Sequence, residues 1–337
     1  MRLPALTLCA LLAGTPAFAN DGYAGLGAGG LEFGKSETIE MRSEDLLLSR
    51  SRVSVDYLFH NSGKANEEVV IAFQLPPFAP GDVEMGMALP QAIREARTMN
   101  YLDFTATVDG KRVPLSSEVS YHLPNPDEPY LWGMEALERA GKDIGAEMRA
   151  LGAPESYDYE AIMAWYQALP AKDRKRLLTL GAFVSGESGP SPNYLVSVRY
   201  YWEQVFKAGQ DLKIHHDYTP VLGGSVYYVS DELTADYCID AGTRKAMDKV
   251  AATAMAENSG LYVLLADLEY VLRTANTWKG PIGKFRLTLD KEDPKAVISL
   301  CADGLKKTGP TTFVLEKKDY TPSEDIRVLF TAALPNE

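Results

Sequence analysis

The chain has 337 residues, with 34 Lys and Arg against 46 Asp and Glu and a formal net charge of −12. This acidic balance argues against nucleic acid and against an anionic membrane surface as partners, because both attract basic patches. Hydrophobic residues make up 46% and charged residues 24% of the chain, which are ordinary globular values and exclude global disorder. After residue 19, no stretch approaches the roughly 18 apolar residues of a membrane-spanning helix.

The N-terminus has the three parts of a cleavable signal peptide. Arg2 supplies positive charge, residues 3–12 are mostly apolar, and residues 17–19 form an A-x-A cleavage site. The apolar run is too short to cross a hydrocarbon layer of roughly 30 Å, so it is a targeting segment and not an anchor. We therefore expect cleavage near Ala19–Asn20 and a mature protein that is periplasmic or secreted.

Alternation of apolar and polar residues predicts β-strands along most of the mature chain. Residues 53–59 and 69–75 alternate in this way and are joined by turn-forming residues, which predicts a hairpin with one buried face. Asp109-Gly110 predicts a second hairpin turn. Residues 194–206 and 212–218 are two further strands, joined by a short turn, and we expect them to be neighbours across one ladder.

Helical spacing replaces this alternation at about 130–181. Asp158 can cap one helix there, Pro170 can begin the next, and Gly181 can end it. We therefore predict a mainly β fold with two antiparallel β-sandwich-like domains. The first, 20–230, carries the helical insertion, and the second, 231–337, combines a helix at 243–258 with strands.

Two cysteines remain after the expected cleavage, Cys238 and Cys301. An even number of cysteines in an oxidising compartment predicts one disulfide, which closes a loop of about 60 residues. Two separate buried thiols are the alternative. A metal site is disfavoured, because no His or Cys stands at ligand spacing around either cysteine.

Several segments resemble an exported bacterial family catalogued as domain of unknown function 4424. The resemblance covers most of the mature chain and includes NDGYAGLGAGGLEF, VSVDYLFHN and GPIGKFRLTLD. Its most specific part runs from Trp202-Glu203-Gln204 to His216-x-Tyr218-x-Pro220. The resemblance implies an exported protein and supplies no catalytic residues.

Two further motifs favour neither a cofactor nor a metal. Residues 25–30 fit G-x-G-x-x-G, but dinucleotide binding needs a strand before this motif and a helix after it. Here the motif precedes a β pattern, so we interpret it as a flexible or edge-strand arm. His215 and His216 are consecutive on a predicted strand, where side chains point to opposite faces and do not readily chelate one ion. We predict no cofactor and no metal site.

Aromatic residues concentrate on the strands at 194–206 and 212–218. Tyr200 and Trp202 share one strand face, and His216 and Tyr218 share one face of the next strand. Two interpretations stay open. The four side chains form a surface for a ligand or partner, or they pack in the core against the helical insertion.

These observations favour a non-enzymatic binding or cell-envelope accessory protein, with an unknown envelope protein or a glycan as its partner. The alternative is a glycan-directed envelope hydrolase that uses paired carboxylates. Asp267 and Glu269 are candidates, because they share one face of a predicted strand.

Overall fold

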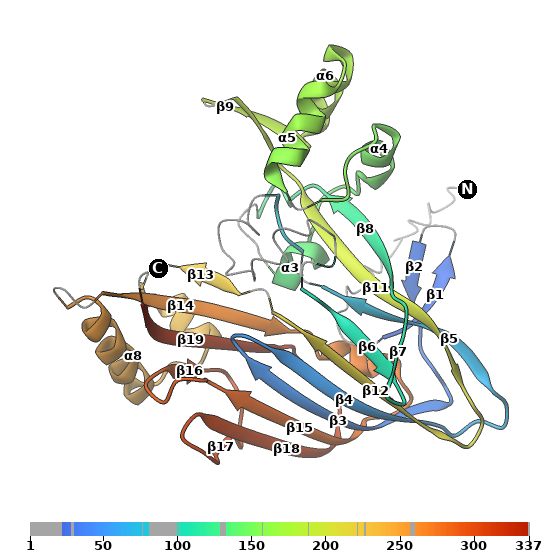
Figure 1. The fold of residues 1–337 in the computed structure, drawn as a ribbon, viewed down its shortest axis with the longest axis vertical. Helices are drawn as coiled ribbons and strands as arrows, with labels where there is room; N and C mark the ends of the chain where they lie inside the picture. Colours follow the sequence, from blue (N-terminus) through green and yellow to red (C-terminus); the bar gives the residue numbers. More distant parts are fainter. Residues whose placement is uncertain are drawn as a thin grey trace, which may run out of the picture.

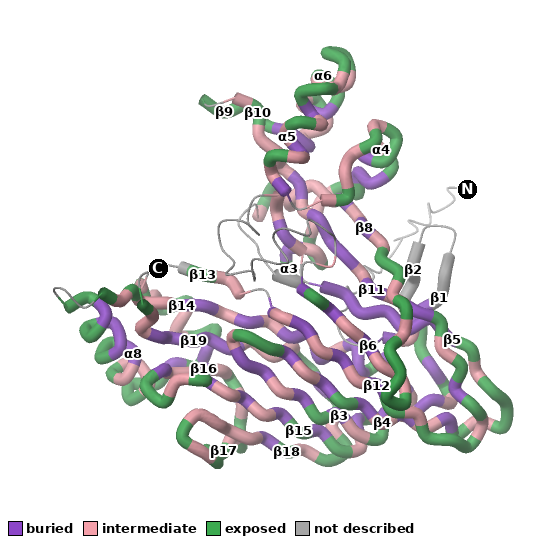
Figure 2. The backbone as a smooth tube through the Cα atoms, viewed as in Figure 1, coloured by how far each residue is buried: buried purple, intermediate pink, exposed green. Residues whose placement is uncertain are grey.

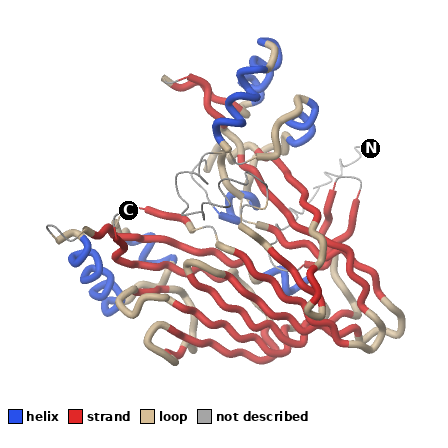
Figure 3. Tube along the Cα trace, viewed as in Figure 1, coloured by secondary structure: helices blue, strands red, loops and turns tan. Residues whose placement is uncertain are grey.

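The computed structural model describes residues 22–27, 30–75, 77–80, 100, 102–128, 133–156, 158–187, 189–220, 222–225, 227–256 and 260–335. The predicted signal peptide lies outside these residues. Strands dominate, most of them in antiparallel sheets, and helices are few (Figures 1 and 3). The predicted mainly β fold class is therefore confirmed. No helix among the described residues has the length and apolar character needed to cross a membrane.

The large sheet has eight strands. In spatial order they are β17 (Lys306–Lys307), β18 (Thr312–Tyr320), β15 (Ile282–Asp290), β3 (Ile39–Ser49), β4 (Val53–Asn61), β12 (Asp211–Tyr218), β6 (Thr105–Val108) and β7 (Lys111–Arg112). β15 runs parallel to β3, whereas the other neighbours are antiparallel. Strands from both predicted segments, 20–230 and 231–337, are therefore hydrogen-bonded within one sheet. The predicted turn at Asp109-Gly110 is confirmed, since both residues have positive φ between β6 and β7.

The second sheet has five strands and packs on the large sheet. In spatial order they are β2 (Gly30–Phe33), β1 (Gly22–Gly27), β5 (Glu67–Gln74), β11 (Leu195–Phe206) and β8 (Ser116–His122). The glycine-rich arm thus forms the edge hairpin β1–β2, with Gly27 paired to Gly30. Buried residues alternate along the strands, as the sequence pattern requires (Figure 2). Phe59 of β4 and Phe206 of β11 meet across the interior, with ring centroids 5.8 Å apart.

Two predicted hairpins are wrong, although their strands exist. β4 belongs to the large sheet and β5 to the second sheet, and the same is true of β12 and β11. Each pair is an arch that crosses the interior from one sheet to the other. The physical reason is that alternation identifies the buried face of a strand but not its hydrogen-bonded neighbour. The same turn residues can join two strands of one sheet, as a hairpin, or two strands of different sheets, as an arch.

The third sheet has four strands, in the order β13 (Gly223–Ser225), β14 (Leu261–Tyr270), β19 (Ile326–Pro335) and β16 (Val297–Ser299). One face supplies Leu268 and Phe330 to the main core. The other face, with Leu265 and Leu329, packs against Met247 of α8 (Ala241–Ala254). This helix corresponds to the predicted helix at 243–258 and begins at Asp240, whose side chain accepts a hydrogen bond from the Thr243 N–H. α7 (Asp231–Asp236) precedes it.

The predicted helical insertion is present (Figure 1). It contains α3 (Gly133–Glu138), α4 (Gly145–Ala150), α5 (Tyr159–Ala168) and α6 (Ala171–Leu180), followed by the hairpin β9 (Phe183–Gly186) and β10 (Gly189–Pro192). Its α4, α5 and α6 project from the sheets, whereas α3 lies beside them. Asp158 caps α5 by accepting hydrogen bonds from the backbone of Glu160 and Ala161, and α6 ends at Gly181 with φ of 87°. Both predicted helix boundaries are confirmed.

Candidate functional site

The predicted aromatic surface is buried. Tyr200 and Trp202 of β11 and His216 and Tyr218 of β12 are 2%, 4%, 0% and 8% exposed, respectively. They point between the large sheet and the second sheet instead of toward solvent. The structure thus corrects the predicted contact surface, because β11 and β12 form an arch whose facing sides enclose the core. The second interpretation, packing in the core against the helical insertion, is right about burial. It is incomplete about the contacts, because these rings pack against one another and against residues of the strands.

The aromatic cluster formed by these four residues extends to Phe73 and Phe104. The Phe104 ring stacks on Tyr200 at 5.0 Å and lies 5.0 Å from the His216 ring. Burial lowers the pKa of His216 to about 3, and the neighbouring His215 acts in the same direction. The same burial raises the pKa of Tyr200 and Tyr218. These side chains therefore stay neutral at ordinary pH, and the cluster serves as packing.

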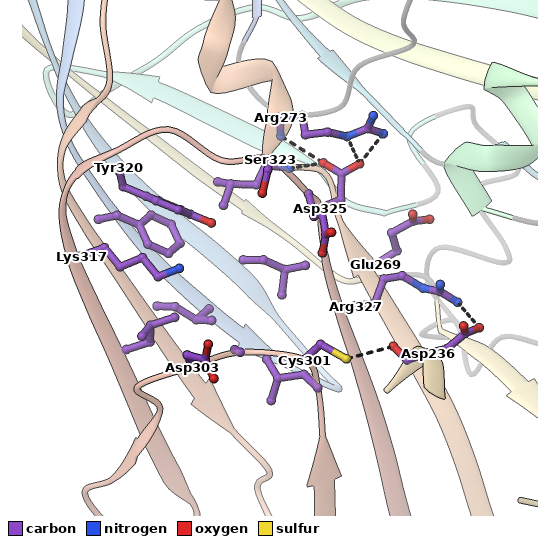
Figure 4. Close-up of a pocket in the computed structure, with 18 of the residues that line it drawn as sticks. Asp236, Glu269, Arg273, Cys301, Asp303, Lys317, Tyr320, Ser323, Asp325 and Arg327 are labelled. Carbon is purple, nitrogen blue, oxygen red and sulfur yellow. Dashed lines mark hydrogen bonds and ion pairs between the residues drawn. The ribbon is translucent and has the colours of Figure 1, made fainter. Parts of the chain in front are cut away.

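A different feature has the shape of a ligand site. A cavity of about 700 Å³ lies between the inner face of the large sheet and an edge of the third sheet (Figure 4). Its floor is apolar and includes Phe285 and Leu287 of β15 and Leu315 of β18. These residues alternate with exposed charged residues along their strands, and this period-2 pattern aims them inward.

One wall of the cavity is held by Asp325, in the loop before β19. Its carboxylate accepts hydrogen bonds from the backbone N–H groups of Leu272 and Arg273, at 2.8 and 3.0 Å, and from Arg273 Nε at 2.8 Å. Arg273 also pairs with Glu138 of α3, and the two carboxylates raise the pKa of its guanidinium. These contacts tie the loop, the end of β14 and the helical insertion together at this wall.

The same wall continues at Arg327 of β19, two residues after Asp325 (Figure 4). Its guanidinium lies 3.6 Å from an Asp236 carboxylate oxygen and 5.1 Å from the centre of the Tyr237 ring. Glu269 of β14 is the direct cross-strand partner of Arg327 and also lines the cavity. Burial raises the pKa of nearby Asp267 to about 7, and the charge of Glu269 adds to this shift. The carboxylate of Asp267 fills the space where a Cβ on its ladder partner Gly223 would lie.

The cavity walls carry more negative than positive groups. Seven carboxylates line it, namely Glu135, Glu138, Asp236, Glu269, Asp303, Glu324 and Asp325, against Arg139, Arg273, Lys317 and Arg327. The three arginines are each engaged by carboxylates. The Lys317 ammonium lies 4.2 Å from the centre of the Tyr320 ring, a cation–π contact inside the site.

The predicted disulfide between Cys238 and Cys301 is present, and Cys301 lines the cavity. The disulfide joins the segment that follows β16 to the segment that follows α7. Within the part of the chain that the structure describes, no three His, Cys, Asp or Glu side chains are grouped closely enough to hold a metal ion.

Comparison with known proteins places the chain in a family. A family model described as "Domain of unknown function (DUF4424)" matches residues 19–329. The chain belongs to the DUF4424 family. A search of curated proteins found no match. Among solved structures, the chain is similar to a Legionella pneumophila protein provisionally described as a nutrient binding protein. The two share 15% identity over 88% of this chain and 68% of that one, with a TM-score of 0.41, too low to carry functional information.

In this DUF4424 chain the matched region contains every residue that lines the cavity. It includes β14, β15, β18 and the first four residues of β19. Of the residues that line the cavity, the sequence analysis identified Glu269 as a candidate acid and Cys301 as a disulfide cysteine. It did not predict that they share one site. The lining comes from segments far apart in the chain, and its charged residues show only the ordinary alternation of a solvated strand.

Proposed function

We propose that this DUF4424 protein is an exported, non-enzymatic binding protein of the cell envelope, and that its ligand occupies the cavity between the large and third sheets. One observation carries the proposal. The cavity of about 700 Å³ combines an apolar floor, formed by Phe285, Leu287 and Leu315, with charged walls. Ligand sites typically enclose roughly 300–1,000 Å³ and combine apolar surface with polar groups that orient the ligand.

The walls are suited to holding a ligand without large rearrangement. Asp325 fixes one wall through three hydrogen bonds, and the Cys238–Cys301 disulfide fixes the rim. A preorganised site loses less conformational entropy when it binds. The N-terminal charge, apolar run and A-x-A site of residues 1–19 support export, and N-terminal sequencing of the native protein tests it. We expect a start at Asn20, and an intact Met1 contradicts export by this route.

Binding in the cavity is tested with the neutral apolar dye Nile red. We expect saturable fluorescence enhancement with the wild-type protein. Ala302 lines the cavity, so the indole introduced by Ala302→Trp should fill it and abolish the fluorescence enhancement. Ala252→Trp is the matched control, because Ala252 is exposed on α8 outside the lining. Equal dye binding by all three folded proteins would rule out the cavity as the site.

The alternative function, a glycan-directed hydrolase, has one observation in its favour. Asp267 has a pKa raised to about 7, a value suited to a general acid, and Glu269 lies two residues further on the same strand. Only Glu269 lines the cavity, however, so the pair does not converge on one accessible space. Dye release from labelled peptidoglycan, abolished by Asp267→Asn and by Glu269→Gln, is the result that would favour the hydrolase over the binding protein.

A further inference from the structure

The walls of the cavity are dominated by acidic side chains. Among the described residues that line it, seven are acids and four are bases, and the whole chain has a formal net charge of −12. Asp303 and Glu324 are both exposed at the lining, so they present carboxylates to a molecule that enters the cavity. A charged ligand therefore meets a field whose sign favours a cation.

The arginines of the lining do not reverse this field. Arg273 Nη2 lies 2.5 Å from a carboxylate oxygen of Glu138 and 2.7 Å from one of Asp325. The guanidinium of Arg327 lies 3.6 Å from an oxygen of Asp236. An anionic ligand would compete with these protein carboxylates for the guanidinium groups, whereas a cationic ligand leaves the pairs intact.

Tyr320 lies on the side of the cavity opposite these arginines (Figure 4). The Lys317 ammonium lies 4.2 Å from the centre of its ring, and the centre of the Phe285 ring lies 5.2 Å away. An aromatic ring of this cavity thus already contacts a cation. Burial raises the pKa of the Tyr320 hydroxyl, and the negative charges of Glu324 and Glu44 raise it further. Negative charge therefore acts on this side of the cavity as well.

The floor supplies an apolar surface next to these charges. Phe285 and Leu287 of β15 and Leu315 of β18 are buried and line the cavity. An apolar group that covers this floor gains affinity in proportion to the area removed from water, whatever the charge of the ligand. The floor thus selects an apolar body, and the walls select the charge attached to it.

We propose that the cavity binds a small amphipathic cation, which places an apolar ring or alkyl chain on the floor and an ammonium group in the field of the exposed acids Asp303 and Glu324. This inference rests on the proposed function, since it names the ligand class of the same cavity. Replacing the ammonium group by a carboxylate reverses the sign of every interaction with the charged walls. Ligand charge should therefore set the order of affinities when the apolar body is kept constant.

Three probes that share one apolar body test the charge requirement, namely phenylbutylamine, phenylbutanol and phenylbutyrate. At neutral pH they are positive, uncharged and negative, respectively. Their affinities for the full chain are measured by displacement of Nile red at low ionic strength. We expect the amine to bind at least tenfold more tightly than the carboxylate, with the alcohol between them. Ala302→Trp should abolish binding of the amine, and Ala252→Trp should retain it.

Removal of two wall charges tests whether the acids of the cavity are responsible. Asp303→Asn combined with Glu324→Gln should weaken binding of the amine at least fivefold and change binding of the alcohol less than twofold. The matched control combines Glu187→Gln with Glu203→Gln, because both acids are exposed and neither lines the cavity. This control removes the same charge from the chain, but distant exposed charges are screened, so the affinity for the amine should stay within twofold.

Lys317 supplies a test of opposite sign. Its side chain brings a positive charge to the lining, and Lys317→Met removes that charge while it keeps an apolar stem. The amine should bind at least threefold more tightly to this variant, and phenylbutyrate should bind more weakly. In a site that used Lys317 to hold an anion, phenylbutyrate would be the tightest probe of the wild type.

Several results would overturn the proposal. Equal affinities of the three probes, or tightest binding of phenylbutyrate, overturn the cationic ligand class while the cavity stands as a binding site. Equal losses of amine affinity in the two double variants overturn the role of the cavity acids. Nile red binding that is blocked by Ala302→Trp, without displacement by any probe, also overturns the amphipathic cation alone. Absence of dye binding, together with absence of probe binding in a calorimetric titration, overturns the proposed function itself.

Discussion

Trp202 and His216 meet edge to face across the core, with ring centroids 5.5 Å apart and planes at 83°. Their strands, β11 and β12, follow one another in the chain but belong to different sheets. The pair therefore joins the large sheet to the second sheet at the inside of an arch. Contacts of this kind stabilise the association of the sheets, and they make the stability of the fold sensitive to both residues.

Trp202→Ala should strongly destabilise the protein. The indole is 4% exposed and contacts the His216 ring, so its removal leaves a cavity between the sheets. Such truncations cost about 3–5 kcal/mol in free energy of unfolding, measured here by urea denaturation. Tyr201→Ala is the matched control, because Tyr201 is only partly buried and belongs to a small cluster on the other face of β11. An equal effect of the two substitutions would contradict this placement of Trp202.

His216 should make the protein less stable in acid. Its pKa is about 3 in the fold and 6.5 ordinarily, so between these pH values the unfolded chain binds a proton that the folded chain does not. The free energy of unfolding should therefore fall as the pH decreases from 6.5, by about 3 kcal/mol at pH 4 from this residue alone.

The measurement is the pH dependence of urea unfolding in the wild type and in His216→Phe. The variant should lack the part of the slope that comes from His216, even if its stability at pH 7 also changes. His60→Gln is the control, because His60 pairs with Asp211 and does not contribute to the pKa shift of His216, so its removal should leave that part of the slope in place. Identical slopes in the wild type and His216→Phe would show that position 216 does not take up the proton.

Reduction of the Cys238–Cys301 disulfide should lower stability. The bridge spans a sequence separation of 63 residues, and closing a loop of that size is worth about 4 kcal/mol in the chain-entropy model. Both cysteines are exposed, so a mild reductant reaches them without unfolding the protein. Intact mass should rise by two hydrogens on reduction, and the melting temperature should fall. Thiols that alkylate freely in unreduced native protein would contradict the bridge.

Gly283→Ala should disrupt the pairing of β15 with β3. A Cβ at this position would lie 2.7 Å from the backbone carbonyl oxygen of Arg42, closer than Cβ atoms are found in proteins. Arg42 lies at the irregularity between Met41 and Ser43, where the register of β3 shifts. Moving the backbone there to make room for a methyl group should cost free energy. We expect a loss of about 1–3 kcal/mol in free energy of unfolding. Lys284→Ala, an exposed change on the same strand, should cost less than about 0.5 kcal/mol.

Local sequence rules found most of the elements but not their arrangement. Asp158, Gly181 and Asp109-Gly110 act through short-range hydrogen bonds and backbone torsion, so their roles are visible in a few consecutive residues. The arches and the parallel β15–β3 pair depend on contacts between distant segments. The alternation of apolar and polar residues within a strand carries no information about such contacts. Helical spacing predicted helix from about residue 130, but the chain between α3 and α4 is held extended where Asp143 bridges to His122.

The candidate site shows the same limit. Cys238 and Cys301 were paired correctly, because only two cysteines follow the predicted signal peptide. Alternation predicted β11 and β12 on one ladder and left open whether their aromatic residues form a surface or a core, whereas the structure buries them between two sheets. The cavity is lined by residues from segments far apart in the chain, a tertiary arrangement that the local pattern of one strand does not encode.

The parallel pairing of β3 with β15 also governs when the protein can fold during synthesis. β3 is made well before its partner at residues 282–290, because β4 to β14 are made between them. Until then the nascent chain carries β3 with an open edge, which invites association with other chains and calls for protection by a chaperone. A chain that terminates before residue 282 would keep that edge open permanently, so premature termination should yield aggregates in place of a smaller folded protein.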